Sequence, residues 1–412
     1  MFEMKPTEDR VILVAVSVDS ENETKASLRE LAELAKTAGA SVAETVIQNR
    51  ESVHPGTYLG KGKIEELKAL LYMLDANGII CDDELSPAQM NNLEQALECK
   101  VMDRTLLILD IFAGRARTSE GKIQVELAQL KYRQARLVGL RSSLSRLGGG
   151  IGTRGPGEKK LEMDRRLITD RIASLGKELE EVKRHRELIR EGRGRNAAKV
   201  AAIVGYTNAG KSTLLNTLTR AGVLEEDALF ATLDPTTRVL DLPGGTQILL
   251  TDTVGFIRKL PHHLINAFRS TLEEAVHADL ILHVVDSSNP QMEEQMAVVY
   301  ETLQQLGMKK KTVITLFNKQ DKAAAAGQRL ADPMADHTFR ISAKTGAGLE
   351  EFGAALEEIL LKEQIYIERL YSYQEGGKIA LIRQYGTLLS EEFLAEGTKI
   401  KAYVPAEIYG KV

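Results

Sequence analysis

The sequence has few cysteines, no tryptophan and no long apolar run. Its 412 residues include two cysteines, Cys81 and Cys99, and no cluster of cysteine and histidine, which argues against a disulfide framework and a structural zinc site. No run of 18 apolar residues is present, so we expect no transmembrane helix. The first residues, MFEMKPTEDR, lack the apolar core of a signal peptide. A reducing cytoplasm is the simplest compartment for such a chain.

Basic charge is concentrated in one segment. The net charge of the chain is −4, yet residues 104–200 carry 23 Lys and Arg against 12 Asp and Glu. The remainder of the chain is therefore strongly acidic. A local excess of basic charge often marks a surface that binds a polyanion.

Strand and helix patterns divide the chain into four expected parts. VILVAVSV at 11–18 is typical of a buried strand, an amphipathic helix is expected over 26–38, and continued alternation predicts an α/β subdomain over 1–112. Two charged helical segments flank the stretch GGGIGTRGPG, which predicts a helical hairpin over 113–195 with a glycine-rich basic loop at 148–157. Alternation resumes in an α/β domain over 196–362, and a small C-terminal α+β domain is expected over 363–412.

The motif GYTNAGKST follows the apolar strand KVAAIV and opens a helix. It fits G-x-x-x-x-G-K-[ST], with Gly205, Gly210, Lys211 and Ser212 at the fixed positions, in the strand–loop–helix setting of a P-loop. Glycines let backbone N–H groups converge on phosphate oxygens, and the helix N-terminus adds positive potential. Lys211 is expected to reach the β- and γ-phosphates, and Ser212 to ligate Mg²⁺.

Three further elements follow in the order and spacing of a GTPase. TQILLTDTVGF supplies Asp252, expected to hold Mg²⁺ through a water, and Gly255, whose N–H would sense the γ-phosphate. VITLFNKQD supplies Asp321, whose carboxylate can accept two hydrogen bonds from the N1–H and N2–H₂ edge of guanine. Adenine lacks both donors in that arrangement. In SAKTG, the Ala343 N–H is placed to meet guanine O6. The pattern predicts a Mg²⁺-dependent GTPase.

The switch threonine has three candidates in LFATLDPTTRVL, namely Thr232, Thr236 and Thr237. Such a loop lends one hydroxyl to Mg²⁺ when the γ-phosphate is present. The FATLDP context resembles the switch of Obg-like GTPases, which favours Thr232. The alternative for the other two is a turn or strand threonine near Pro235.

Phe256 stands where many GTPases carry a glutamine that orients the attacking water. A phenyl ring cannot do so, and intrinsic hydrolysis is expected to be slow or to rely on another group or a partner. In GTPases with an asparagine at the position of Asn208 and no such glutamine, K⁺ held by that side chain can replace an arginine finger. The alternative is a polar loop residue without an ion.

Lys211, Asn208 and Gly255 are the expected catalytic residues, and Ser212 and Thr232 the direct metal ligands. The nucleotide-binding residues are expected to be Gly205, Tyr206, Thr207, Asn208, Ala209, Gly210, Lys211, Ser212, Thr213, Phe230, Thr232, Asp252, Thr253, Val254, Gly255, Asn318, Lys319, Asp321, Ser342, Ala343 and Lys344.

Longer stretches of the chain resemble the HflX family of GTPases over nearly the whole length. They are PGTYLGKGKIEEL, GRARTSEGKIQVELAQLKY, GGGIGTRGPGEKKLEMDRR, GYTNAGKST and FATLDPTTR. The resemblance implies an N-terminal domain of the HflX type, a helical hairpin, a G domain and a short C-terminal domain. It also implies a cytoplasmic protein that binds the large (50S) ribosomal subunit and splits or rescues stalled ribosomes under stress. Ribosome binding usually stimulates the GTPase activity of such proteins.

The basic loop offers independent support for an RNA partner. Basic side chains on a glycine-rich tip can neutralise RNA phosphates and enter a narrow RNA cavity. The alternative is a solvated helix surface with an unstructured connector. The candidate RNA-binding residues are Arg146, Arg154, Lys159, Lys160 and Arg165, with Arg166 beside them.

Three functions remain open from the sequence. The leading one is a ribosome-bound GTPase switch, expected to be monomeric. The second is a GTPase in ribosome assembly or RNA modification, although neither cysteine lies in a context that suggests a modification enzyme. The third is a nucleotide-gated regulator of another protein complex.

Overall fold

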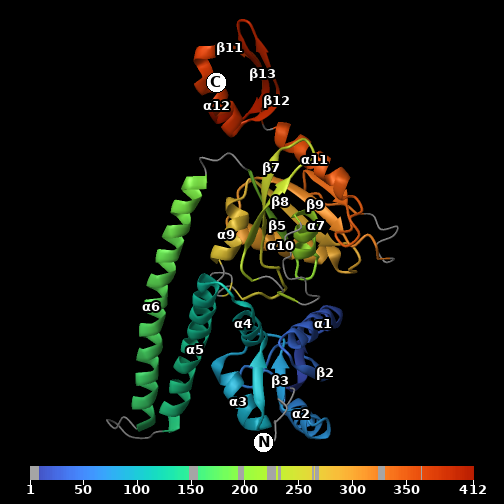
Figure 1. The fold of residues 1–412 in the computed structure, drawn as a ribbon. Coiled ribbons are helices and arrows are strands. Elements are labelled where there is room, and N and C mark those ends of the chain that lie inside the picture. The colour runs from blue at the N-terminus through green and yellow to red at the C-terminus, as the bar shows by residue number, and fades with distance from the viewer. Residues whose placement is uncertain are drawn as a thin grey trace, which may run out of the picture. The chain divides into compact units, whose positions relative to one another are not determined.

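The computed structural model describes residues 9–147, 156–193, 199–219, 229–230, 233–261, 264, 269–322, 330–362 and 364–412. The chain forms two compact units (Figure 1). The first unit comprises residues 1–182, 227–234 and 257–269, and the second comprises residues 183–226, 235–256 and 270–412. Among the described residues, no helix is both long enough and apolar enough to cross a bilayer.

The first unit is built on a parallel four-stranded sheet with the order β2-β1-β3-β4. Buried side chains on one side of the sheet, among them Ile12, Ile79 and Val101, pack with helix residues such as Leu67 and Leu93. The strands are β1 (Arg10–Ser17), β2 (Ser41–Asn49), β3 (Gly78–Cys81) and β4 (Lys100–Asp103), and the helices are α1 (Glu21–Thr37), α2 (Lys61–Met73), α3 (Pro87–Leu97) and α4 (Arg104–Arg115).

The helix that the sequence predicts over 26–38 begins five residues earlier. Ser20 precedes it in an extended conformation, and its Oγ accepts a hydrogen bond from the Glu23 N–H at 3.4 Å. A serine in that position satisfies one of the free N–H groups of the first turn. Helix α4 has no signal in the sequence, and it starts where Asp103 accepts a hydrogen bond from the Leu106 N–H at 2.8 Å.

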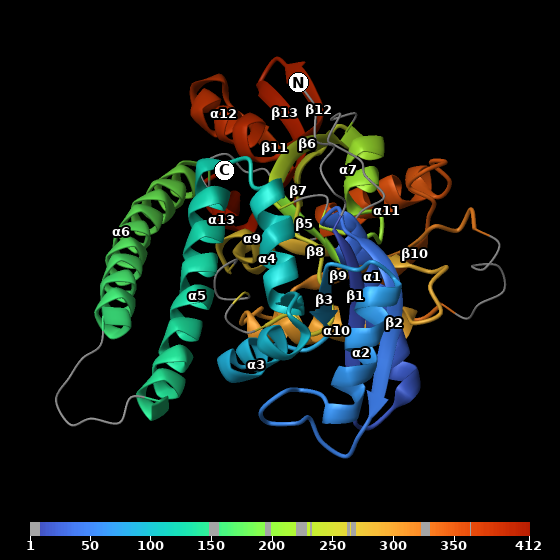
Figure 2. The ribbon, with the colours of Figure 1, turned by 90° about the horizontal axis from the view of Figure 1, so that it is seen from below.

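Two long helices form the predicted hairpin, α5 (Ser119–Leu147) and α6 (Pro156–Arg193). They run side by side in both views (Figures 1 and 2). Leu127 packs with Leu175 and Leu179, and Arg171 donates to both Glu126 oxygens at 2.8 and 3.1 Å. The predicted loop at 148–157 is shorter at its C-terminal end because Pro156 opens α6, a position that proline favours. Residues 148–155 lie outside the described part.

The second unit contains a six-stranded sheet with the order β10-β9-β8-β5-β7-β6, parallel except for β6 against β7. Its core joins Ile203 and Leu250 of the sheet to Leu214 and Phe352 of two helices. The strands are β5 (Lys199–Gly205), β6 (Thr236–Asp241), β7 (Gln247–Asp252), β8 (Leu280–Asp286), β9 (Thr312–Asn318) and β10 (His337–Arg340), and the helices are α7 (Lys211–Thr219), α9 (Arg269–His277), α10 (Met292–Gln305) and α11 (Leu349–Lys362).

Residues 365–412 of the second unit form a small α+β element, as expected from the sequence. An antiparallel sheet has the order β11-β13-β12, and Ile382 packs on Ile400 and Val404. Its elements are β11 (Ile365–Tyr371), a 3-10 helix (Tyr373–Glu375), α12 (Gly376–Tyr385), β12 (Thr387–Leu394), β13 (Gly397–Val404) and α13 (Ala406–Tyr409). The predicted fold class is confirmed, whereas the four domain limits stay a prediction.

Candidate nucleotide-binding site

The P-loop requires glycine at two positions. Gly205 ends β5 with φ 155°, and a Cβ there would lie 2.2 Å from the Val284 carbonyl oxygen. Gly210 has φ 97°, and a Cβ there would lie 2.3 Å from Nδ2 of Asn318. Both distances are below any real Cβ contact, so any side chain at these two positions would force the loop to move. Asn208 also adopts a left-handed conformation, with φ 58°, which asparagine tolerates better than most residues.

Lys211 is buried at the start of α7. Its Nζ donates to the carbonyl oxygens of Tyr206 at 2.8 Å and Gly205 at 3.2 Å. Burial lowers the pKa of Lys211 to about 8; nearby Lys319 acts in the same direction, and the Asp252 carboxylate opposes both. The P-loop therefore holds a cation that a phosphate group would stabilise.

Ser212 and Asp252 lie together at the ends of α7 and β7. The Ser212 Oγ donates to Oδ2 of the fully buried Asp252 at 2.9 Å. A hydroxyl and a carboxylate are the hard oxygen donors that Mg²⁺ prefers, so this pair fits the metal expected from the sequence. Thr232 lies outside the described residues. Thr237 is on β6, with its Oγ1 2.9 Å from Oγ1 of Thr251, which supports the reading of Thr237 as a strand threonine.

The segment after Asp252 lies directly against the P-loop. The Phe256 N–H donates to the Gly205 carbonyl at 3.1 Å, and the Phe256 carbonyl accepts from the Thr207 N–H at 2.8 Å. A Cβ on Gly255 would lie 2.8 Å from Thr207 Cγ2 and 2.9 Å from Lys211 Nζ. Glycine is thus required at 255 for this close approach. The Phe256 ring is 1% exposed and cannot present a polar group to water.

One buried amide joins the P-loop to the two loops expected to recognise guanine. Asn318 Nδ2 donates to the Ala209 carbonyl at 2.9 Å, and Asn318 Oδ1 accepts from the Ala343 N–H at 2.8 Å. The Ala343 N–H, expected to meet guanine O6, is used within the protein here. Ser342 Oγ donates to Asp321 Oδ1 at 2.6 Å, and this bond lowers the pKa of the Asp321 carboxyl.

Asp286 is a site residue that the sequence analysis missed. Lys319, which has φ 63°, donates to the Asn208 carbonyl at 2.7 Å and pairs with Asp286 at 2.8 Å. Asp286 is the last residue of the apolar strand β8. A carboxylate at the carboxyl end of a parallel strand next to the P-loop strand was the signal that could have identified it.

The remaining predicted residues lie on several elements of both units. Thr253 Oγ1 donates to the Ile203 carbonyl at 2.8 Å, and Val254 is buried. Thr213 lies in the first turn of α7, and Lys344 is exposed. Phe230 is 2% exposed and packs in the first unit against Phe112, with ring centroids 4.7 Å apart. The structure therefore gives Phe230 a packing role.

The structure describes only part of the candidate RNA-binding set. Arg165 and Arg166 are exposed on α6, and Arg166 lies 3.8 Å from Glu162. Arg146 belongs to α5, and Lys159 and Lys160 belong to the first turns of α6. The side chains of these three residues, and Arg154 entirely, fall outside the described part.

Comparisons with known proteins agree with this site. Three sequence families match consecutive parts of the chain. They are described as GTP-binding GTPase N-terminal (residues 25–113), GTP-binding GTPase Middle Region (115–193) and 50S ribosome-binding GTPase (200–319).

Curated relatives match over most of their length. A GTPase HflX from Lacrimispora saccharolytica is 68% identical, covering 100% of this chain and 97% of that protein. One from Caldanaerobacter subterraneus is 49% identical and covers 99% and 94%, and one from Escherichia coli is 41% identical and covers 88% and 85%. A GDP complex of a GTP-binding protein from Sulfolobus solfataricus is 26% identical and covers 85% of this chain and 98% of that chain, with a TM-score of 0.46.

Proposed function

Because the chain belongs to the HflX family of GTPases, we propose that it binds the large ribosomal subunit and dissociates or rescues stalled ribosomes under stress, with GTP hydrolysis switching its affinity. The chain is a GTP hydrolase with a ribosome-binding type of GTPase domain. The observation that carries the proposal is the match of residues 200–319 to GTPases described as binding the 50S ribosome.

The hairpin formed by α5 and α6 supports an RNA partner. Its basic residues are concentrated in sequence on both sides of residues 148–155, and Arg165 and Arg166 are exposed on α6. We propose that the RNA-binding residues are Arg146, Arg154, Lys159, Lys160 and Arg165. Neutralising phosphates releases counterions, so such binding weakens steeply as salt rises.

The chemistry at the nucleotide requires positioning and charge neutralisation. We propose that the P-loop backbone cradles the phosphates, that Lys211 neutralises the β- and γ-oxygens, and that Gly255 contacts the γ-phosphate. Ser212 and Thr232 would hold Mg²⁺ directly and Asp252 through a water, and the metal would offset the charge that develops on the phosphate oxygens. Because buried Phe256 cannot orient a water, we propose that K⁺ held by Asn208, or a group from the ribosome, completes the site.

The cellular setting follows from the same proposal. We propose that the protein acts in the cytoplasm as a monomer, and that 1–112, 113–195, 196–362 and 363–412 are its domains.

The alternative of an RNA-modifying enzyme receives no support from the cysteines. Cys81 is fully buried, and burial raises the pKa of both Cys81 and Cys99, whereas a nucleophilic cysteine needs a lowered pKa.

Sedimentation tests the proposal directly. The purified protein is mixed with 50S subunits in the presence of GDP or a non-hydrolysable GTP analogue and pelleted. We expect cosedimentation with the analogue and much less with GDP. A variant with Arg154, Lys159 and Lys160 changed to alanine should lose ribosome binding and keep its affinity for GTP. Equal pelleting with both nucleotides, or none with either, would refute the proposed role.

A further inference from the structure

Two short segments that follow the GTPase motifs in sequence belong to the first unit. The P-loop and residues 235–256 lie in the second unit, whereas residues 227–234 and 257–269 lie in the first. The first of these segments ends directly before Pro235, and the second begins directly after Phe256. Gly255 and Thr232 are the residues expected to respond to a γ-phosphate. In sequence, Gly255 comes two residues before the segment 257–269, and position 232 falls within the segment 227–234.

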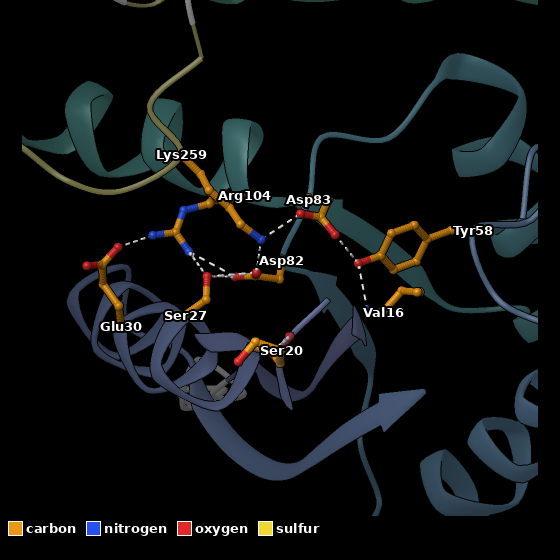
Figure 3. Close-up of polar contacts among 10 residues, drawn as sticks. Val16, Ser20, Ser27, Glu30, Tyr58, Asp82, Asp83, Arg104 and Lys259 are labelled. Carbon is orange, nitrogen blue, oxygen red and sulfur yellow. Dashed lines mark hydrogen bonds and ion pairs between the residues drawn. The ribbon is translucent and has the colours of Figure 1, made fainter. Parts of the chain in front are cut away.

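Lys259 occupies the carboxyl edge of the parallel sheet of the first unit (Figure 3). Its Nζ lies 2.5 Å from Oδ2 of Asp82 and 2.6 Å from Oδ1 of Asp83. Both aspartates directly follow β3, and β3 and β2 flank β1 on opposite sides. Chain connections reverse direction at such a point, which is where open α/β sheets bind their ligands. In this protein the group bound there is a lysine of the chain itself.

Lys259 shares the buried carboxylate of Asp82 with a second cation, Arg104. Arg104 is 1% exposed and pairs with Glu30 and with Asp82, which is fully buried. Ser27 donates to both oxygens of Asp82 at 3.0 and 2.8 Å. Arg104 thus pairs with the carboxylates of Glu30 and Asp82, and Lys259 pairs with those of Asp82 and Asp83. A buried carboxylate deprived of its cation is strongly destabilising.

Other contacts show that this arrangement is fixed in place. Asp83 Oδ2 accepts from the Tyr58 hydroxyl at 2.6 Å, and Tyr58 is 1% exposed. Lys259 has φ 52°, a conformation that a non-glycine residue keeps only where its surroundings determine it. The Lys259 ammonium thus lies in a preformed acidic site made by Asp82 and Asp83.

Asp234 makes the corresponding contact for the other segment. Its Oδ2 accepts from the backbone N–H groups of Arg117 and Thr118, both at 2.9 Å, and its Oδ1 accepts from the Thr118 hydroxyl at 2.5 Å. Thr118 in turn caps α5, since its Oγ1 accepts from the Gly121 N–H at 3.0 Å. A carboxylate at a helix N-terminus is favourable. Asp234 therefore anchors its segment to the start of the hairpin.

We propose that Lys259 and Asp234 are positioning residues through which the first unit holds the two segments in the arrangement that favours GTP. In the structure Gly255 already lies against Lys211 and Thr207, only four residues before the docked Lys259. The ion pairs of Lys259 therefore fix the chain that follows Gly255 while Gly255 lies against the P-loop. By reciprocity, the γ-phosphate then stabilises both docking contacts and so the start of α5.

The first test compares affinities for a GTP analogue and GDP in the full-length protein without ribosomes. Lys259→Met should weaken binding of the analogue relative to GDP by at least about fivefold, the lower end of coupling between sites. The matched control is Lys25→Met, which removes a similarly exposed lysine from an ion pair with Glu21 on α1. The control should leave the ratio unchanged. An unchanged ratio in Lys259→Met, or an equal shift in the control, would overturn the proposal.

The second test uses Asp83→Asn. Asp82 is not replaced, because it also pairs with Arg104 and its replacement risks unfolding the protein. Asp83→Asn should shift the ratio in the same direction, and the double variant should show little further loss beyond Lys259→Met. If the shifts of the two single variants added fully in the double variant, Lys259 would not act through Asp83. Thermal melts establish that each variant is folded.

Hydrogen exchange tests the second contact. Amides in residues 117–122 should exchange at least about threefold more slowly with the analogue than with GDP, and Asp234→Asn should remove that difference. Equal exchange with both nucleotides in the unchanged protein would overturn the role of Asp234. Neither test involves the ribosome, so failure here is distinct from failure of the proposed ribosomal function.

Discussion

Nucleotide affinity should fall as pH rises through the titration of Lys211. Burial lowers the pKa of this ammonium to about 8 in the free site, whereas phosphate oxygens beside it favour the charged form and raise its pKa. At pH values above about 8, binding must therefore include uptake of a proton. Binding should therefore weaken as pH rises, because Lys211 is charged in the complex and loses its proton in the free protein. The weakening sets in near the lower pKa, that of the free protein.

The size of the effect follows from the fraction of charged lysine. With a pKa of about 8, about nine-tenths of the free protein carries the charge at pH 7 and about a quarter at pH 8.5, so the Kd for GDP should rise about fourfold between them. Calorimetry at pH 8 in two buffers of different ionisation enthalpy should show uptake of about half a proton per GDP bound.

A variant separates Lys211 from other titrations. Lys211→Met should bind GDP more weakly, with a pH profile that is flat over the same interval and no proton uptake. The interval ends below the loss of the guanine N1–H, so base recognition is constant. The reasoning would be refuted if the unchanged protein had equal affinity at both pH values, or if the variant retained the same slope.

Three further predictions concern the same site. Gly255→Ala places a methyl 2.8 Å from Thr207 Cγ2 and 2.9 Å from Lys211 Nζ and should lower kcat for GTP at least about tenfold; near-normal turnover would contradict this geometry. Asn318→Ala leaves two buried backbone groups without their bonds and should lower the free energy of unfolding by about 1–3 kcal/mol in urea titrations, with a larger loss when GDP is present; an unchanged midpoint would contradict it. Hydrolysis should be faster in potassium than in sodium, and Asn208→Ala should remove the difference; equal rates in the two salts would reject the potassium hypothesis.

Local motifs were predictable because their geometry depends on neighbouring residues. The P-loop follows from glycines at 205 and 210 and from the helix that starts at Lys211. The hairpin follows from two charged helical segments on either side of a glycine-rich stretch. By contrast, α4 has the nearly continuous apolar sequence RTLLILDIFAGR, which lacks a helical period and so gave no signal.

Contacts between distant parts of the chain were not predictable. Lys259 binds Asp82 across 177 positions, and Asp234 binds Thr118 across 116. Neither residue stands out in sequence, since each is one charge among many. The use of the Ala343 N–H by Asn318 is a similar case, because only the fold brings those two loops together.

Asn318 and Asp321, both expected to bind the guanine base, should differ in how much change they tolerate. Asp321 is exposed, and its carboxylate accepts a hydrogen bond from the Ser342 hydroxyl. The amide of Asn318 is buried, and both its nitrogen and its oxygen form hydrogen bonds. A new base preference could therefore arise by altering the carboxylate while the phosphate cradle survives. Replacing the amide would remove its bonds to both the P-loop and the Ala343 N–H, so we expect a change of base preference to be tolerated at Asp321 and not at Asn318.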